Sequence, residues 1–262
     1  MSYNKHSFNY FVLLLIISGC SSAAPPEPKR IVDLSPTRGE NYAVERMGKA
    51  ISQMFGYRSP TKFERNVFEG NIYITDTYLT LYNHMGVHHD PPNHIIKGGM
   101  STDQFPLDRF FGKAKVLDYR DKPKDEPLMR SDFENKGIAA DDIVIAFVGY
   151  DPPSGDEELP SYAYLSGEAA EYLASIPIKA FATDMPSTGS FHQYIKNAQA
   201  GIMGSENYLP EHYALLSKNI VNIEGLVNLE SIVDEEYVVF VGFPLKIENG
   251  TGAPIRAAAL VY

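Results

Sequence analysis

Short apolar segments along the chain predict most of its strands. Segments at residues 30–34, 115–119, 142–149, 178–183, 220–223, 237–243 and 257–262 have the length and apolar content typical of strands. Residues 142–149 are almost continuously apolar, which is typical of a strand buried on both faces. Residues 70–81 alternate apolar and polar positions around Ile72, Ile74 and Tyr78, which predicts a strand that leads into residues 84–94.

Helical periods separate several of these strands. Residues 40–55 carry apolar side chains at the spacing of one helix face, and residues 210–216 are also expected to be helical. Ser166 is a suitable N-cap for a helix over residues 166–174, and residues 226–232 form a short helix or a turn. Too many strands follow one another for a plain doubly wound sheet, and no repeat or second domain boundary is visible. The pattern predicts one mixed α/β domain over residues 30–262.

The first 29 residues have the composition of a targeting segment and a tether. Lys5 precedes an apolar run at residues 11–17 that is too short for a comfortable membrane span. Ser18 and Gly19 then precede Cys20, which resembles the lipobox of bacterial lipoproteins. We expect a signal peptide over residues 1–19, a lipid anchor at Cys20 as the only membrane contact, and a flexible tether over residues 20–29. The protein would then be exported and anchored in the bacterial cell envelope, on the periplasmic face if the cell has an outer membrane. A cleaved signal peptide with an incidental cysteine is the alternative.

Charge and cysteine content exclude several kinds of function. The formal net charge is −10 and no basic residues cluster, which argues against nucleic-acid binding. Because Cys20 is the only cysteine, neither an intramolecular disulfide nor a thiolate zinc site can form.

Four of the seven histidines fall in the stretch from His84 to His94, together with Asp90. Imidazole and carboxylate bind divalent metals such as zinc or manganese, and a free imidazole can move protons near neutral pH. The stretch therefore supplies both halves of a hydrolase that uses a metal-activated hydroxide. If the segment is an extended strand, His84, His88 and Asp90 face one way and His89 faces the other, as a structural or supporting histidine.

The pattern H-x-G-x-H-x-D-x-P-x-H over residues 84–94 resembles the signature of the metal-dependent cyclase family, which includes bacterial kynurenine formamidase and isatin hydrolase. Further matching segments are 33–35, 98–99, 106–107, 111–112, 183–187, 212–216, 224–229, 244–247 and 252–256. The resemblance implies a compact, barrel-like α/β domain of the swivelling β/β/α type, which forms a homodimer or homotetramer. It also implies a small-molecule substrate and one or two divalent ions, zinc or manganese, per chain.

The same resemblance assigns roles to residues that spacing alone would leave on the surface. It implies that His84, His88 and Asp90 hold a first metal, and that Asp90, His212 and Glu224 hold a second. It implies that His94 donates and accepts protons, with service as a third ligand to the second metal as the alternative. Asp184 and Ser187 are turn residues with a possible supporting role.

The expected reaction is hydrolysis of a small cyclic or N-acyl amide, or of a lactone. The kynurenine formamidase branch places an aromatic residue, typically tryptophan, against its substrate, and this chain has no tryptophan. Arylformamidase activity on N-formylkynurenine and a non-catalytic, metal-bearing binding lipoprotein are the alternatives.

Overall fold

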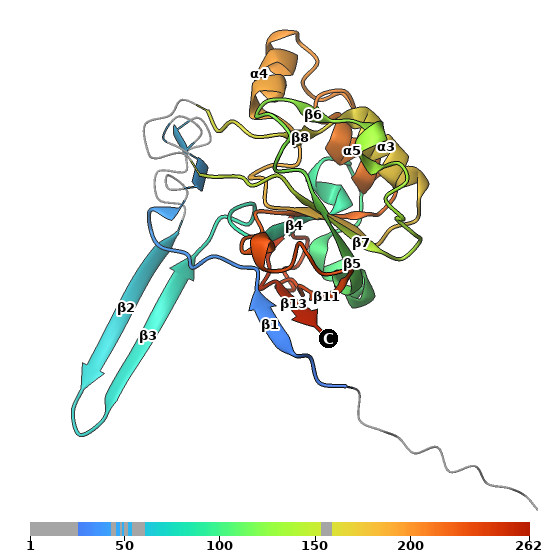
Figure 1. Cartoon of the computed structure of the whole chain (residues 1–262). Helices are drawn as coiled ribbons and strands as arrows, with labels where there is room; N and C mark the ends of the chain where they lie inside the picture. The colour runs from blue at the N-terminus through green and yellow to red at the C-terminus, as the bar shows by residue number, and fades with distance from the viewer. Residues whose placement is uncertain (1–25, 43–45, 48, 50–51, 54–60, 153–158) are drawn as a thin grey trace, which may run out of the picture.

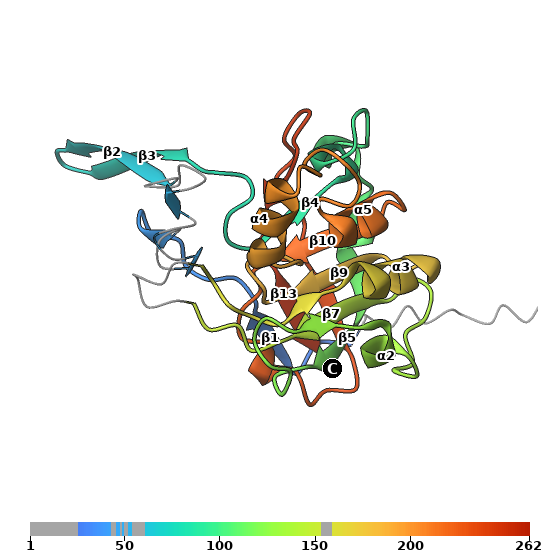
Figure 2. The ribbon, with the colours of Figure 1, turned by 90° about the horizontal axis from the view of Figure 1, so that it is seen from above.

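A curled, nine-stranded mixed sheet forms a half-barrel at the centre of the protein (Figures 1 and 2). The computed structural model describes residues 26–262, except for 43–45, 48, 50–51, 54–60 and 153–158. The strand order is β1-β13-β11-β5-β7-β9-β10-β4-β12. The neighbours β5, β7, β9 and β10 are parallel, and all other pairs are antiparallel. The strands span Arg30–Asp33 (β1), His88–Asp90 (β4), Phe111–Asp118 (β5), Ile143–Phe147 (β7), Ala180–Thr183 (β9), Val221–Glu224 (β10), Val238–Val241 (β11), Ala253–Pro254 (β12) and Ala258–Val261 (β13).

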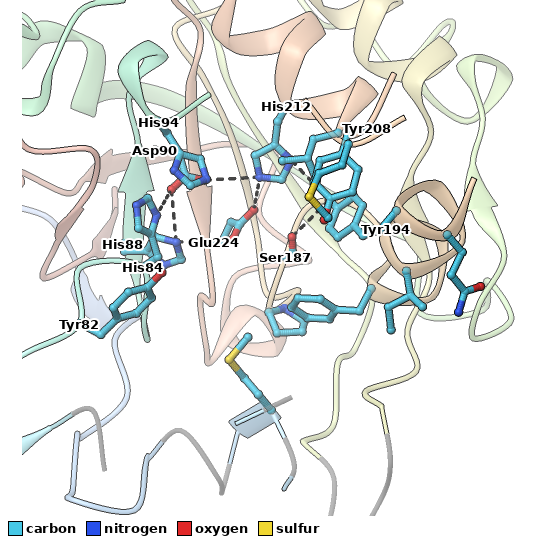
Figure 3. Close-up of a pocket in the computed structure, with 18 residues that line it drawn as sticks. Tyr82, His84, His88, Asp90, His94, Ser187, Tyr194, Tyr208, His212 and Glu224 are labelled. Atoms are coloured by element: carbon cyan, nitrogen blue, oxygen red, sulfur yellow. Dashed lines mark hydrogen bonds and ion pairs between the residues drawn. The ribbon is translucent and has the colours of Figure 1, made fainter. Parts of the chain in front are cut away.

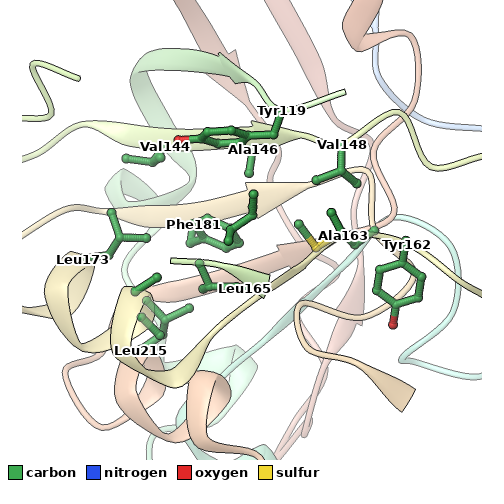
Figure 4. Close-up of a cluster of buried hydrophobic side chains, with 14 of the residues drawn as sticks. Tyr119, Val144, Ala146, Val148, Tyr162, Ala163, Leu165, Leu173, Phe181 and Leu215 are labelled. Carbon is green, nitrogen blue, oxygen red and sulfur yellow. The ribbon is translucent and has the colours of Figure 1, made fainter. Parts of the chain in front are cut away.

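The central parallel strands are buried on both faces because each face has its own apolar core. Val144 on β7 and Phe181 on β9 belong to the core beneath the helices (Figure 4). Their neighbours Ile143 and Ala182 belong to a second core on the opposite face. Since successive side chains of a strand point to opposite faces, a strand between two cores must be apolar throughout. The prediction of a strand buried on both faces at residues 142–149 is confirmed, although β7 is somewhat shorter than expected.

Three helices lie on one side of the sheet, over its β9, β10 and β4 end (Figure 2). They are α3 (Gly167–Ser175), α4 (Phe191–Gln199) and α5 (Pro210–Leu216). Ser166 caps α3 as predicted, since its side chain accepts a hydrogen bond from the Ala169 amide at 3.1 Å. Helix α4 was not expected from the sequence. The shorter helices are η1 (Pro92–His94), η2 (Thr102–Gln104), η3 (Leu107–Phe110), α2 (Arg130–Phe133) and η4 (Leu229–Ser231).

A long hairpin projects from this body (Figure 1). Strand β2 (Lys62–Glu69) pairs along its whole length with β3 (Tyr73–Thr80), and the two form a sheet of their own. Residues 70–81 are therefore largely a strand, as predicted, but the expectation that this strand leads directly into the histidine cluster is wrong. Residues 81–87 leave the hairpin without regular structure before β4 begins, because β3 pairs with β2 and not with the central sheet. Strands β6 (Pro127–Leu128) and β8 (Tyr164–Leu165) form another small sheet.

Some predictions fall on residues outside the described ones. The helix expected over residues 40–55 is described only in part, and its described members from Tyr42 to Gln53 are helical. The signal peptide over residues 1–19, the anchor at Cys20 and most of the tether over residues 20–29 also lie outside. Within the described residues, no helix has the length and apolar character needed to cross a membrane.

Candidate active site

The register between β4 and β10 places four polar side chains on the face of the sheet that carries the helices. Asp90 is paired with Asn222, and His88 is paired with Glu224. Paired residues of antiparallel strands lie on the same face, so two carboxylates, an amide and an imidazole become neighbours. All four are buried, with at most 4% of their surface exposed. His89 lies between them in sequence and faces the other way.

His84 joins this group from a turn and not from the strand. The predicted strand geometry is wrong here, because β4 covers only His88–Asp90 and residues 83–87 turn. Gly86 in this turn has a φ of +70°, a left-handed conformation that favours glycine. Its carbonyl accepts a hydrogen bond from His88 Nδ1 at 2.8 Å. A Cβ on Gly225 would lie 2.7 Å from the same carbonyl oxygen, so the close approach of the two backbones requires glycine at 225.

His212 reaches the cluster from helix α5, which packs over β10. His212 Nδ1 lies 3.0 Å from Oε1 of the buried Glu211 carboxylate. When Nδ1 carries a proton, it donates a hydrogen bond to this oxygen. The Tyr194 hydroxyl donates to the same carboxylate oxygen. With Nδ1 held in this way, Nε2 of His212 faces Asp90 and Glu224 (Figure 3). A carboxylate behind the imidazole is the usual arrangement behind a metal-binding histidine.

Asp90 lies between two groups of potential metal ligands. Its Oδ1 is 2.7 Å from His84 Nδ1 and 3.4 Å from His88 Nε2. Its Oδ2 is 3.5 Å from His212 Nε2, and Glu224 Oε1 lies 3.1 Å from the same nitrogen. Within each group, His84–His88–Asp90 and Asp90–His212–Glu224, the donor atoms lie within 4.8 Å of one another.

This donor set fits one or two divalent cations. Imidazole nitrogens and carboxylate oxygens suit zinc and manganese, and buried carboxylates require a compensating charge. In both His88 and His212, Nδ1 is hydrogen-bonded to an acceptor and Nε2 points toward the carboxylates. A proton on Nδ1 leaves the lone pair of Nε2 available, which is the tautomer that binds a metal. The structure thus brings together all five residues that the sequence suggested as ligands.

The ionisation of the cluster is consistent with cation binding. Burial raises the pKa of Asp90, but the charge of His88 and hydrogen bonds from His212 and His84 outweigh burial and hold that pKa well below its usual value. For His212, burial lowers the pKa, but hydrogen bonds to Asp90, Glu211 and Glu224 outweigh burial and raise it. Asp90 and Glu224 are therefore ionised, and His88 and His212 carry protons that a bound metal would replace.

His94 stands at the edge of the cluster at the end of η1. Its ring centre is 4.1 Å from that of His84 and 6.2 Å from that of His212. Burial lowers the pKa of His94 to about 4, so its imidazole is neutral at pH 7. His94 lines the same pocket as the five candidate ligands.

His89 is a structural residue in the second core. Its Nε2 lies 3.1 Å from the Thr102 hydroxyl, and its ring meets the edge of Phe110. Burial lowers the pKa of His89 to about 3, which keeps it neutral. The prediction that His89 faces away from the cluster is confirmed.

Sequence reasoning missed the groups that orient the carboxylates. Asn222 Nδ2 donates to Asp90 at 3.0 Å and to Glu224 at 2.9 Å. The Thr188 hydroxyl donates to the Asn222 amide oxygen, and the Thr188 amide donates to Glu224. Asn222 lies two positions before Glu224 on one strand, so period-two alternation could have indicated it.

The two turn residues left open by the sequence have different surroundings. Asp184 accepts hydrogen bonds from the amides of Val148 and Tyr150 at 3.0 and 2.7 Å, so it holds the backbone after β7. The Ser187 hydroxyl lines the pocket and lies 3.4 Å from the Tyr194 hydroxyl.

Comparisons with known proteins agree with this geometry. Residues 32–190 match the model of the Cyclase family. The chain is 32% identical over 180 residues to kynurenine formamidase of Salinibacter ruber, covering 68% of this chain and 76% of that protein. It is 30% identical over 204 residues to isatin hydrolase of Roseibium aggregatum, covering 70% of this chain and 74% of that protein.

Solved structures share the fold. An isatin hydrolase bound to the product analogue thioisatinate superposes with a TM-score of 0.68 at 26% identity, covering 88% of this chain and 92% of that chain. A potential metal-dependent hydrolase with cyclase activity superposes with a TM-score of 0.66 at 20% identity, covering 89% of this chain and 98% of that one, a likeness of fold alone.

Proposed function

Because the chain belongs to the Cyclase family and is a hydrolase, we propose that it uses bound metal to hydrolyse a small cyclic or N-acyl amide, or a lactone. One observation carries this proposal: two groups of donors, buried except for the half-buried His84, share Asp90 at one side of a pocket that His94 also lines. In this proposal, the ligands of one or two zinc or manganese ions are His84, His88, Asp90, His212 and Glu224.

A cation held there would act as a Lewis acid, lowering the pKa of water and polarising the substrate carbonyl. Asp90 and Glu224 would keep their orientation through Asn222. His94, neutral at pH 7, has a ring nitrogen available to accept a proton from the attacking water. As the water oxygen bonds to the carbonyl carbon and the C–N or C–O bond breaks, His94 passes that proton to the departing nitrogen or oxygen.

The test is to purify the full chain, supplement it with zinc or manganese, and measure bound metal per chain and hydrolysis of cyclic amides, formamides and lactones. We expect one to two ions per chain and turnover of at least one compound class. A metal content near zero in the supplemented protein would contradict the proposal. Bound metal without any turnover would favour a binding protein instead.

N-formylkynurenine belongs in the same panel as the second candidate substrate. The identity of 32% to a protein named kynurenine formamidase favours including it. The absence of tryptophan from this chain argues against it. A kcat/KM for N-formylkynurenine above that of the cyclic amides would establish the second candidate.

We further propose that the chain forms a homo-oligomer through the β2–β3 hairpin. An isolated two-stranded hairpin is at best marginally stable, so this one needs a partner surface. Large side chains on and around it are exposed, namely Val67, Phe68, Ile72, Tyr73, Ile74, Tyr78 and Leu79. The pairing register places Val67, Tyr73 and Leu79 on one face of the hairpin and Phe68, Ile74 and Tyr78 on the other. At ~100 Å² of exposed surface each, the side chains of both faces together present on the order of 700 Å². A standard interface buries ~800 Å² per partner, so a second copy would have to cover both faces of the hairpin, in a symmetric exchange.

A second copy fits this surface better than a lipid surface does. The hairpin carries two basic residues, Lys62 and Arg65, against three acidic ones, Glu64, Glu69 and Asp76. Its net charge is therefore −1, which gives no attraction to anionic lipid headgroups. Membrane attachment is proposed only through a lipid on Cys20, with the protein exported to the cell envelope.

A further inference from the structure

The cavity beside the cluster is larger than the reacting group of a small amide requires. Its volume is about 530 Å³, within the range of sites that hold a whole drug-sized molecule. The histidines and carboxylates occupy one side, while Tyr194 and Tyr208 lie on the other (Figure 3). The reacting carbonyl would fill only the first part, so the remaining part must accommodate another portion of the substrate.

Helix α4 builds the apolar wall of this second part. Phe191, Ile195 and Ala198 follow one another at spacings of four and three residues, so one face of α4 borders the cavity. Met203 and Leu209 extend the wall beyond the helix. The polar residues on this side, such as Gln199 and the tyrosines, are uncharged.

Among the described residues that line the cavity there is no lysine or arginine. Arg46, which lines a small neighbouring pocket together with His84 and His88, lies over the ring of Tyr150. Arg38 lies over the ring of Tyr42 and donates a hydrogen bond to the Val87 carbonyl. A substrate carboxylate placed against α4 would lose its hydration without a compensating charge, which is strongly unfavourable.

We propose that the substrate carries a neutral apolar group, larger than the amide or lactone that reacts, and that this group binds against the α4 wall. The inference rests on the proposed hydrolase function and assigns Phe191, Ile195 and Ala198 as specificity-determining residues. It disfavours N-formylkynurenine, whose amino-acid end is charged.

Matched formanilides test the inference on the metal-loaded full chain. The three substrates are formanilide, its 4-butyl derivative and its 4-carboxylate derivative. Water adds to the formyl carbon and the C–N bond breaks, which gives formate and the aniline. Relative to formanilide, we expect kcat/KM to be about tenfold or more higher for the butyl compound and about tenfold or more lower for the carboxylate, because buried methylenes are favourable and an unpaired buried anion is not.

A charge placed on the wall should weaken this preference. In Ala198→Arg, the ratio of kcat/KM for the butyl compound to that for the carboxylate should fall at least tenfold, with an absolute gain for the carboxylate. Ala198→Met changes size without charge and should keep the preference. Ala200→Arg makes the same substitution at an exposed position of the α4 C-terminus that does not line the cavity, and the ratio should stay within twofold.

The outcomes separate the inference from the proposed function. A wild-type preference for the carboxylate, or a ratio that Ala198→Arg leaves unchanged, would overturn the inference while hydrolysis stands. If none of the three is hydrolysed, calorimetric binding decides. Tighter binding of the butyl compound supports the apolar wall and counts against the hydrolase, whereas equal or weaker binding overturns the inference too.

Discussion

Glu211 offers the sharpest test of how the protein prepares a metal ligand, because it contacts the cluster only through His212. Its Oε1 lies 3.0 Å from His212 Nδ1, and only 4% of the side chain is exposed. Replacing the carboxylate in Glu211→Gln removes a charge-assisted hydrogen bond and leaves the side-chain volume unchanged. Loss of such a partner costs roughly 10- to 100-fold in metal affinity, which is about 1.4–2.7 kcal/mol.

The effect can be worked out for thermal or urea unfolding. With free metal at a hundred times the wild-type Kd, binding stabilises the folded state by about 2.7 kcal/mol. If Glu211→Gln weakens binding tenfold, this contribution falls to about 1.4 kcal/mol at the same metal concentration, and after a hundredfold loss it falls to about 0.4 kcal/mol. The difference in the free energy of unfolding with and without metal therefore reports the affinity.

Comparing metal-loaded and metal-free protein separates this effect from helix stability. Glu211 lies in the first turn of α5, where a negative charge interacts favourably with the helix dipole, so the metal-free variant loses about 0.3–1 kcal/mol in any case. Glu206→Gln, an exposed glutamate shortly before α5, is the matched control and should leave metal affinity unchanged. A Kd in Glu211→Gln within twofold of wild type, by calorimetry or chelator competition, would refute the reasoning.

The remaining predictions concern the proton carrier, a buried carboxylate, the hairpin and the anchor. His94→Ala should lower kcat about 10²- to 10⁴-fold with metal content unchanged; a fall in bound metal per chain would instead identify His94 as a ligand. Burial raises the pKa of Asp184 from an ordinary value of 3.8 to about 6, so the folded state binds this proton more tightly than the unfolded chain does. Protonated Asp184 therefore adds about 3 kcal/mol to the free energy of unfolding below pH 4, and this contribution is lost as the pH rises to 6. Urea titrations at several pH values should show the loss in the wild-type protein and not in Asp184→Asn. Phe68→Glu should weaken self-association at least tenfold in sedimentation experiments, whereas Leu245→Glu, at another exposed apolar position, should not; a wild-type monomer at 50 µM, a concentration of the order at which weak dimers form, would count against the hairpin interface. Cys20→Ser should move the protein from the membrane fraction to the soluble one, and an unchanged distribution would argue for an incidental cysteine.

Much of the secondary structure follows from local pattern. The apolar run at β7, the N-cap at Ser166 and the helical segment at α5 are encoded by residues close in sequence, and all three are where the pattern predicts them. Helix α4 is different. It was not predicted, although Phe191, Tyr194, Ile195 and Ala198 recur at the spacing of one helix face and the Ser190 side chain caps the helix.

The metal-ligand cluster also has one part that the sequence indicates and one part that depends on the tertiary structure. The stretch from His84 to His94 determines by itself that imidazoles and a carboxylate meet, because its donors lie within eleven residues. Nothing local distinguishes His212 or Glu224 from surface residues, and only a likeness to a family suggested them. Their approach to Asp90 depends on the antiparallel register of β4 with β10 and on α5 packing over that strand.

The orienting groups depend partly on local sequence and partly on the tertiary structure. Glu211 is next to His212 in the sequence, and Asn222 lies two positions before Glu224 on one strand. Only the register of β4 with β10 brings Asn222 to Asp90. Short-range patterns specify which side chains are available and which face of an element they occupy. Contacts between residues more than a hundred positions apart are decided by the packing of whole elements, which no local pattern encodes.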